Sequence, residues 1–510
     1  MGKNVNRPGH DVDLLIVGGG INGAGIARDA AGRGLRVALV EQGDFGGATS
    51  SASTKLIHGG LRYLEHFEFR LVAEALAERD VLLRIASHIA RPLRFVMPQV
   101  AGLRPAWLIR SGLWLYDHLG GRTGLPRSHA VRLAPDRYGA GLDPRITRGF
   151  AYSDAWVDDA RLVILNLRSA QAHGATLMPR TRFVGAQRHD GAWQASVEPA
   201  QGGVRRALRA RVLVNAAGPW VKPVLDACGG ARTATQAQLV KGSHIVVPRI
   251  HAGEHALILQ NRDRRIVFMI PYEQRFTLIG TTDVVVTSLD EARAISAGES
   301  RYLLDAVNRY LVRPLAAHDI VWSYAGARAL DDDGSRDPSQ TTRDYSLVID
   351  ERDGIAQLVV FGGKITTYRR LAETVLDRLR PWLRPRRDNW THGEPLPGAV
   401  PDAAIAADLL RARRPALPRP LLEALFRRHG ALADELLGDA RSVSDLGRDF
   451  GGALTEREAA WCVEHEWAAC ADDVLWRRTK AGLHMNVAQR AGFTRWFDRH
   501  HQRLRAHRAP

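Results

Sequence analysis

The sequence predicts an α/β protein that combines a doubly wound parallel sheet, an antiparallel-sheet domain and a C-terminal all-helical domain. Three observations support this fold class. Over residues 13–40, an apolar run, a glycine-rich turn, a helix of small residues and a second apolar run follow one another. Over residues 239–279, short apolar runs alternate with turns, as in antiparallel sheets. Residues 401–510 carry helical patterns and almost no strand signal.

The N-terminal unit reads as strand, turn, helix and strand. Residues 13–17 are continuously apolar, as parallel strands are, and residues 24–33 form a helix that Gly34 ends. Residues 35–40 form the second strand, which closes on the acid Glu41. This order within about thirty residues is that of a dinucleotide-binding βαβ unit.

The glycines of the turn follow the pattern G-x-G-x-x-G. Gly18 permits the tight turn, Gly20 lets the backbone approach a pyrophosphate, and Gly23 lets helix and strand pack closely. The helix N-terminus then presents free N–H groups to the phosphates. Glu41 is placed to accept hydrogen bonds from ribose hydroxyls, and its charge would repel the 2′-phosphate of NADP.

The segment after this acid separates FAD from NAD. Residues 46–55 are a long run of glycine and small hydroxyl residues, which can place donors along a pyrophosphate and a flavin. An NAD enzyme normally has no such run at this point. The composition of residues 56–63, which follow directly, is too structured for a flexible linker. We therefore expect FAD.

The remaining elements can be predicted more coarsely. Residues 68–90 have helical spacing until Pro92 stops the run, and residues 103–119 form another helix rich in aromatic side chains. Residues 211–214 and 358–361 are strands that each enter a glycine-containing loop.

Residues 395–401, with three prolines and a glycine, are predicted to be a linker. The domains we expect are a discontinuous cofactor domain, a substrate domain and a helical domain: 1–90, 150–235 and 325–394; 91–149 and 236–324; and 395–510.

The composition of the 510-residue chain, with 45% hydrophobic and 25% charged residues, is that of a soluble globular protein. No apolar run reaches the roughly 18 residues that span a bilayer, and residues 1–10 lack a signal-peptide core, so we expect a cytoplasmic protein. The net charge of +16 favours anionic partners, but no RNA-recognition motif accompanies it, and we expect no nucleic acid.

Cysteine and lysine are both rare. The three cysteines are too scattered for a disulfide framework, and the spacing of Cys462, His465 and Cys470 suits a helical core better than a metal site. Only six of the 71 basic residues are lysines. Each lysine is therefore a candidate for a position that requires a compact ammonium group and not a guanidinium group. Lys241 and Lys364 both fall within the motifs described next.

Residues 48–65 resemble the signature of the FAD-dependent sn-glycerol-3-phosphate dehydrogenases. Further blocks that resemble this family follow in order: 241–248, 279–283, 342–345, 361–368 and 474–480. The resemblance extends from about residue 11 to about residue 490 and implies a D-amino-acid-oxidase-like FAD fold. One departure is local: the family commonly has a proline after its substrate arginine, whereas Arg328 is followed by Ala329.

The resemblance also implies the residues of the site. Those expected to contact FAD come from the glycine turn, the acid, the hydroxyl-rich run and two later strand ends: Gly18, Gly19, Gly20, Ile21, Asn22, Gly23, Glu41, Gln42, Thr49, Ser50, Ser53, Asn215, Ala216, Gly218, Gly362, Gly363 and Thr366. Those expected to bind a phosphorylated triol are the following: Arg62, Tyr63, Arg328, Arg343 and Lys364.

The implied reaction is hydride transfer from C2 of sn-glycerol 3-phosphate to flavin N5, with electrons passing to a membrane quinone. A histidine suits the loss of the 2-hydroxyl proton. His58 and His244 both lie in matched motifs; we prefer His244, and the sequence leaves the choice open. Arg328 and Lys364 would assist as cations at the reacting end.

Two other interpretations compete. One is an amino-acid or 2-hydroxy-acid oxidoreductase of the same superfamily, against which the residues at 62–63 and 364–368 argue. The other is a basic membrane- or RNA-binding protein that keeps a flavin fold, against which the substrate arginines argue.

A quinone acceptor requires the protein to dock peripherally on the inner face of the cytoplasmic membrane. Two segments could bind an anionic surface: residues 103–119, and a helix in which Phe493, Trp496 and Phe497 share one spacing among arginines. A homodimer is compatible with the sequence.

Overall fold

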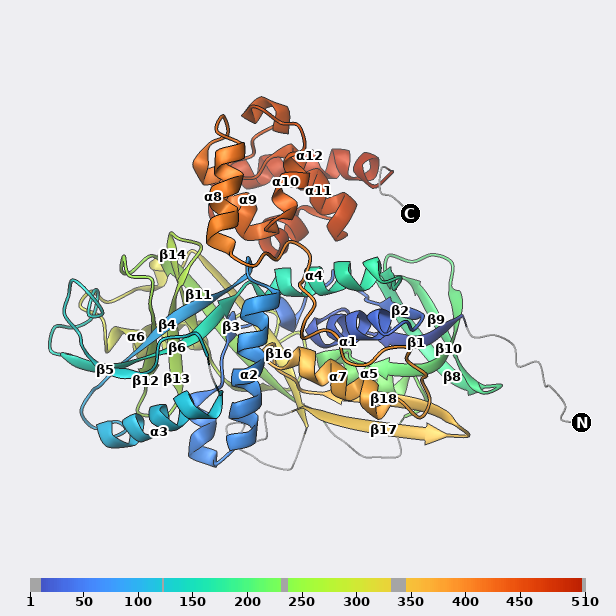
Figure 1. Cartoon of the computed structure of the whole chain (residues 1–510), viewed down its shortest axis with the longest axis horizontal. Coiled ribbons are helices and arrows are strands. Elements are labelled where there is room, and N and C mark those ends of the chain that lie inside the picture. Colours follow the sequence, from blue (N-terminus) through green and yellow to red (C-terminus); the bar gives the residue numbers. More distant parts are fainter. Residues whose placement is uncertain (1–10, 122, 231–236, 332–344, 507–510) are drawn as a thin grey trace, which may run out of the picture.

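The computed structural model describes residues 11–121, 123–230, 237–331 and 345–506 (Figure 1). Within them lie two large sheets and a separate group of C-terminal helices, as the sequence predicts. No helix in these ranges is long and apolar enough to cross a membrane.

The first sheet is a parallel sheet with antiparallel edges. Its strand order is β17 (Ser346–Arg352), β18 (Ile355–Phe361), β10 (Arg206–Asn215), β1 (Val12–Val17), β2 (Val37–Val40) and β7 (Thr176–Met178). All neighbours from β18 to β7 are parallel, and the antiparallel strands β8 (Thr181–His189) and β9 (Ala192–Pro199) attach through β10.

Helices cover one face of this sheet, namely α1 (Ile21–Gly32), α4 (Asp159–Ala172) and α7 (Tyr368–Arg378). On the other face, Trp193 and Val197 of β9 pack against Leu15 and Ala38. The strands between these layers are buried on both sides, which explains why they read as continuous apolar runs.

The second sheet is almost wholly antiparallel. Its order is β15 (Val284–Val286), β11 (Ala237–Pro248), β14 (Phe276–Gly280), β13 (Ile266–Tyr272), β12 (Ala256–Gln260), β4 (Ala90–Pro98), β6 (Arg148–Val157) and β3 (Leu56–Ile57), with β16 (Trp322–Asp331) on β11 and β5 (His129–Arg132) on β6. Helices α2 (Phe69–Ile85) and α3 (Ala106–Leu119) pack on one face, and α6 (Ala297–Asn308) packs on the other.

Two segments that we expected in the cofactor domain pair elsewhere. Residues 150–157 lie in β6 and residues 325–331 lie in β16, both in the second sheet. The chain crosses between the sheets along these strands, so each strand ends in the cofactor region although its body belongs to the neighbouring domain. The helix expected over 68–90 ends at Ile85, because Ala90 already begins β4.

The C-terminal region is helical, with α8 (Ala403–Arg413), α9 (Arg419–His429), α10 (Leu432–Leu437), α11 (Glu456–Glu466), a π-helical turn (Asp473–Arg478) and α12 (Val487–Ala506). Phe493, Trp496 and Phe497 of α12 are buried in the core of this region. These aromatic side chains stabilise the domain and present no apolar face to a membrane, because the helix turns them against α11.

Candidate active site

A cavity of about 680 Å³ lies at the carboxyl ends of β1, β2 and β10. This edge of a doubly wound sheet is where such folds bind their ligands. Most residues predicted to contact the cofactor line it: Gly18, Gly20, Ile21, Asn22, Glu41, Gln42, Thr49, Ser50, Ala216, Gly218, Gly362 and Gly363. Its volume falls in the range of about 300–1,000 Å³ that is typical of small-molecule and cofactor sites.

The glycine turn has no room for side chains. Gly18 has a φ of +113°, and a Cβ there would lie 2.5 Å from the carbonyl oxygen of Ala216. A Cβ on Gly23 would lie 1.9 Å from the carbonyl oxygen of Gly18. The absence of side chains at these glycines lets a ligand in the cavity approach the backbone of the turn closely, as a pyrophosphate site requires.

Ser50 and Glu41 hold this turn from outside the motif. The N–H of Ile21 donates to Ser50 Oγ at 2.9 Å, so a residue 29 positions away satisfies a donor at the start of α1. Glu41 accepts N–H bonds from Gly19 at 2.8 Å and from Gly43 at 2.6 Å. Burial raises the pKa of Glu41, although both hydrogen bonds oppose the rise.

The other predicted cofactor residues stand behind the cavity wall. Ser53 Oγ donates to Asp159 at 2.7 Å, Asn215 Nδ2 donates to the carbonyl of Val221 at 2.8 Å, and Thr366 Oγ1 accepts the N–H of His58 at 3.3 Å. Gly19 and Gly23 act in the same way, through the turn that they shape. These residues fix the shape of the site without lining the cavity.

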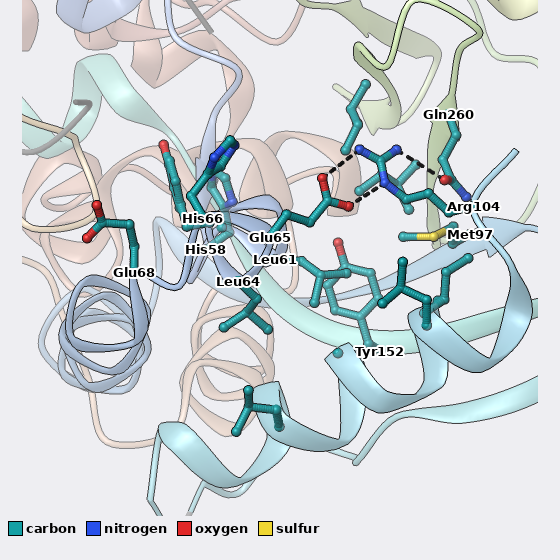
Figure 2. A pocket seen from close by; sticks show the side chains of 18 of the residues that line it. His58, Leu61, Leu64, Glu65, His66, Glu68, Met97, Arg104, Tyr152 and Gln260 are labelled. Atoms are coloured by element: carbon teal, nitrogen blue, oxygen red, sulfur yellow. Dashed lines mark hydrogen bonds and ion pairs between the residues drawn. The ribbon is translucent and has the colours of Figure 1, made fainter. Parts of the chain in front are cut away.

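A second cavity, of about 390 Å³, opens beside the first (Figure 2). His58, Thr281 and Asp283 are among its polar lining residues, whereas side chains of α3 and β13 make much of the rest apolar. Figure 2 shows Arg104 bound to Glu65, with Arg104 Nη1 3.2 Å from Gln260 Oε1.

Arg328 joins the two cavities. It lines the first cavity from β16, and its Nη1 lies 3.5 Å from Oδ1 of Asp283, which lines the second. Arg328 thus lies at the boundary between the cofactor cavity and the neighbouring space.

Lys364 is not itself among the residues that line either cavity, but it follows Gly363, which lines the first, and its ammonium nitrogen lies 3.9 Å from the ring centroid of Tyr63, which lines the second. The nitrogen is buried, and no hydrogen-bond partner for it lies within the described residues. Buried polar atoms are nearly always satisfied, so an unsatisfied ammonium indicates a place for a ligand. Lys241, by contrast, is fully used in an ion pair with Glu299 at 2.7 Å.

The two candidate histidines occupy different surroundings. His244 is buried, its Nε2 lies 3.0 Å from Thr54 Oγ1, and its ring stacks on Tyr324. Burial, followed by the charges of Lys55 and Arg328, lowers the pKa of His244 well below its usual value, so the ring is neutral. His58 lines the second cavity.

Two further arginines are predicted to bind the phosphate. Arg62 lies on the short 3-10 helix Leu61–His66. Arg343 lies outside the described residues.

The sequence analysis missed the contribution of the C-terminal region to the first cavity. Cys470, Asp472, Asp473 and Arg477 line it together with Arg180 of the first sheet's edge. The only signal in the sequence was the block 474–480, which resembles the family. The spacing of its residues does not by itself indicate a binding site.

The residues present fit FAD. The glycine turn, the acid Glu41 and the size of the first cavity suit a dinucleotide. Asn22 Oδ1 is buried in the same wall and has no partner within the described ranges, which leaves an acceptor for a bound group.

Comparison with known protein families agrees with this geometry. The family model of FAD dependent oxidoreductases matches residues 13–369, and the model for the C-terminal domain of alpha-glycerophosphate oxidase matches residues 389–493. The boundary between the two matches falls near the expected linker.

Individual proteins are similar over nearly the whole chain. The aerobic glycerol-3-phosphate dehydrogenase of Escherichia coli K12 is 50% identical over 95% of this chain and 97% of its own length. The D-erythritol 1-phosphate dehydrogenase of Brucella abortus is 48% identical, with the same coverage of 95% and 97%.

Among solved structures, the glycerol-3-phosphate dehydrogenase of Bacillus halodurans complexed with FAD superposes with a TM-score of 0.73 at 24% identity, covering 97% of this chain and 93% of that one. At this level of identity, the superposition supports the fold.

Proposed function

Because the chain belongs to the FAD-dependent oxidoreductase family and, within it, to the glycerol-3-phosphate dehydrogenases, we propose that it oxidises sn-glycerol 3-phosphate to dihydroxyacetone phosphate. The observation that carries the proposal is the junction of the two cavities at Arg328 and Asp283. This junction offers a polar place beside the cofactor cavity, where a guanidinium group and a carboxylate meet. FAD, when bound, supplies the hydride acceptor, and the remaining tasks fall to side chains of the chain itself.

The first task is to bind the substrate phosphate. Arg328 on β16 and Lys364 after β18 supply a guanidinium and an ammonium group from two different elements. Such charge-assisted contacts are strong, and the planar guanidinium can bind two phosphate oxygens at once. We propose Arg62 and Arg343 as further phosphate contacts, and Tyr63 as a contact to the substrate near Lys364.

The second task is to remove the proton of the 2-hydroxyl group. We propose that His244 accepts it, because its buried Nδ1 has no hydrogen-bond partner within the described residues and could take a proton. The lowered pKa of His244 makes it a weaker base than a free imidazole, and its side chain is not among those that line the two cavities. Thr54 holds the ring in place through Nε2. His58 is the competing candidate, since it lines the second cavity.

Anaerobic titration tests the reaction and its substrate. Excess sn-glycerol 3-phosphate should bleach the flavin absorbance of the holoprotein without added NAD. D-erythritol 1-phosphate, the substrate in the name of one relative, should bleach it more slowly at equal concentration. Flavin that stays oxidised with the first compound would exclude the proposed activity, and faster bleaching by the second would reassign the substrate.

Matched histidine variants test the proton acceptor. Loss of a positioned general base slows the chemical step by about 10²- to 10⁴-fold. His244→Asn should therefore slow flavin reduction by this factor under single-turnover conditions, while His58→Asn should slow it much less. The opposite order would move the role to His58.

We also propose that a membrane quinone accepts the electrons through the second cavity. Side chains under α3 give this cavity a largely apolar lining, which suits a quinone ring better than a polyol. Outside it, α3 exposes Trp107 and Trp114, which are 69% and 63% exposed. Phe67 and Phe69, just before and at the start of α2, are also exposed and belong to the lining of the cavity.

This exposed aromatic surface is the membrane-docking face that we propose. Tryptophans suit the membrane interface, and neighbouring arginines favour anionic lipid. Arg110 of α3 is exposed and can provide such a charge. The protein would then lie peripherally on the cytoplasmic side of the membrane.

Sedimentation with anionic vesicles tests the face. The double variant Trp107→Ser/Trp114→Ser should remain largely in the supernatant, while the wild type sediments with vesicles at low salt. Ile405→Ser/Leu409→Ser is the matched control, because those side chains are 59% and 55% exposed on α8 of another domain. Equal loss in both double variants, or none in either, would contradict docking through α3.

A further inference from the structure

The π-helical turn of the C-terminal domain contacts both sheet domains. Trp476 in the turn stacks on Trp322 of β16, with ring centroids 5.0 Å apart. Lys480, just after the turn, places Nζ 3.2 Å from Oδ1 of Asp158, which precedes α4. Helices of this type are rare and frequently mark functional sites. The arginines of the same turn are therefore candidates for a functional role.

Both arginines of the turn bind one carboxylate of the cofactor domain. Arg477 Nε donates to Oδ2 of Asp44 at 2.6 Å, and Arg478 Nη2 donates to Oδ1 of Asp44 at 2.8 Å. A further nitrogen of Arg478 also contacts this carboxylate. Arg478 and Asp44 are both buried. Because a buried charge without its partner is strongly disfavoured, this pairing fixes the position of Asp44.

Asp44 belongs to the loop that follows β2 and forms one wall of the cofactor cavity. Within this loop, the N–H of Gly46 donates to the carbonyl oxygen of Gly19 at 3.0 Å, so the loop also supports the glycine turn. Phe45 packs edge-on against Trp467 of the C-terminal domain, with centroids 5.2 Å apart. The C-terminal domain therefore holds the loop at two successive residues.

A continuous chain of charges then crosses the cavity lining. Arg180, just before β8, places Nη2 2.5 Å from Oδ2 of Asp473. Asp473 also binds Arg477, which in turn binds Asp44. All four side chains line the same cavity, although they come from three separate parts of the chain. The N–H groups of residues 469 and 470 also donate to Asp473, so its carboxylate is fixed on the C-terminal side.

We propose that the C-terminal domain is a clasp that retains FAD. In this role Arg477, Arg478 and Asp473 hold the loop at Asp44 closed over the end of the cavity that contains Glu41, where a dinucleotide places its adenosine ribose. FAD leaves only when this network opens. The arginines of the turn are positioning residues for the cofactor, and they take no part in the chemistry at the flavin.

The rate of FAD release tests the clasp. Arg477→Gln removes one member of the network but leaves Asp44 bound to Arg478 and Asp473 bound to Arg180, so the variant is expected to fold. Holoprotein is diluted and the fluorescence of free FAD is followed. Loss of an outer partner that orients the ligands of a bound metal typically weakens metal binding about 10- to 100-fold, and by analogy we expect FAD release to accelerate by a factor in this range.

Glu273→Gln is the matched control. Glu273 lies near Arg427 and His484 of the C-terminal region, and it joins that region to the second sheet away from the cofactor loop. This variant should lower the melting temperature and leave the rate of FAD release unchanged. If Arg477→Gln releases FAD at the wild-type rate, or if both variants accelerate release equally, the clasp is refuted. Asp44→Asn gives a second measurement, and Arg477→Gln decides alone if that variant does not fold.

Discussion

Replacing Lys364 by methionine should change the stability of the protein little and its activity strongly. The ammonium nitrogen of Lys364 is buried 3.9 Å from the ring centroid of Tyr63 and has no hydrogen-bond partner within the described residues. The contact with the ring returns about 0.5–2 kcal/mol, which only partly offsets the cost of removing an ammonium group from water. Methionine has a similar length and no charge. We therefore expect the free energy of unfolding without substrate to change by less than about 1.5 kcal/mol or to increase.

The effect of the same replacement on substrate binding and turnover should be large and unfavourable. Removing one partner of a buried, charge-assisted contact costs about 2–5 kcal/mol. Since every 1.4 kcal/mol is a factor of about ten, kcat/KM for sn-glycerol 3-phosphate should fall by roughly 30-fold to several thousand-fold. The substrate should also raise the melting temperature of the variant much less than that of the wild type, because ligand stabilisation depends on the dissociation constant.

Two measurements on the same preparations decide the matter: thermal unfolding with and without substrate, and steady-state kinetics with an artificial electron acceptor. Lys222→Met is the control, because Lys222 is 66% exposed and pairs with Asp226 on the surface of α5 (Val221–Asp226). A Lys364→Met protein with wild-type kcat/KM would refute the assignment of this ammonium group to the substrate. A large loss of stability without substrate would show that the group serves the fold.

Two further predictions concern the cofactor and the response to acid. Gly23→Ala should give protein with little bound flavin, measured as the ratio of flavin absorbance to protein absorbance, because the new Cβ would lie 1.9 Å from the carbonyl oxygen of Gly18. Gly492→Ala, on a helix with open space around this position, should retain FAD. Burial alone would raise the pKa of Glu273, but His484 and nearby basic residues hold it at about 2, below the ordinary 4.5. Its carboxylate therefore contributes stability above pH 4.5, on the order of 3 kcal/mol, and loses that contribution as the pH falls toward 2. Denaturant unfolding of Glu273→Gln should match the wild type only at the acidic end, and equal stability at pH 7 would contradict this account.

The sequence predicts the cofactor unit well because its constraints are local. Gly18 and Gly23 are required by backbone geometry within six residues, and Glu41 follows at the end of the next strand. Each of these requirements can be read from spacing alone. The support from Ser50 could not be read in this way, because the N–H of Ile21 and the serine meet only when the chain has folded.

The choice between two amphipathic helices was beyond the sequence for a different reason. Both α3 and α12 carry aromatic side chains at helical spacing with arginines nearby. Spacing defines an apolar face but says nothing of what covers it. In the folded chain Trp496 is buried against the C-terminal core, whereas Trp107 remains exposed. The same limit explains β6 and β16, whose sheet is set by partners far away in the chain.

The sequence also does not show which of the many arginines belong to the site. In the structure, each arginine can be judged by the group with which its charge is paired. Arg33 pairs with Asp29, Arg161 with Glu466 and Arg478 with Asp44, all in buried ion pairs that the protein completes by itself. Such arginines are structural because their charge is already satisfied.

Lys364 differs from these residues, since its charge meets only an aromatic ring among the described residues and lies near the junction of the two cavities. A buried cation that the protein leaves without a counter-ion is costly unless a ligand supplies one. The anionic phosphate of the proposed substrate meets this requirement, whereas a neutral polyol would offer hydroxyl acceptors but no counter-charge. The protein should therefore discriminate strongly against glycerol itself, and the loss of that discrimination in Lys364→Met would follow from the same argument.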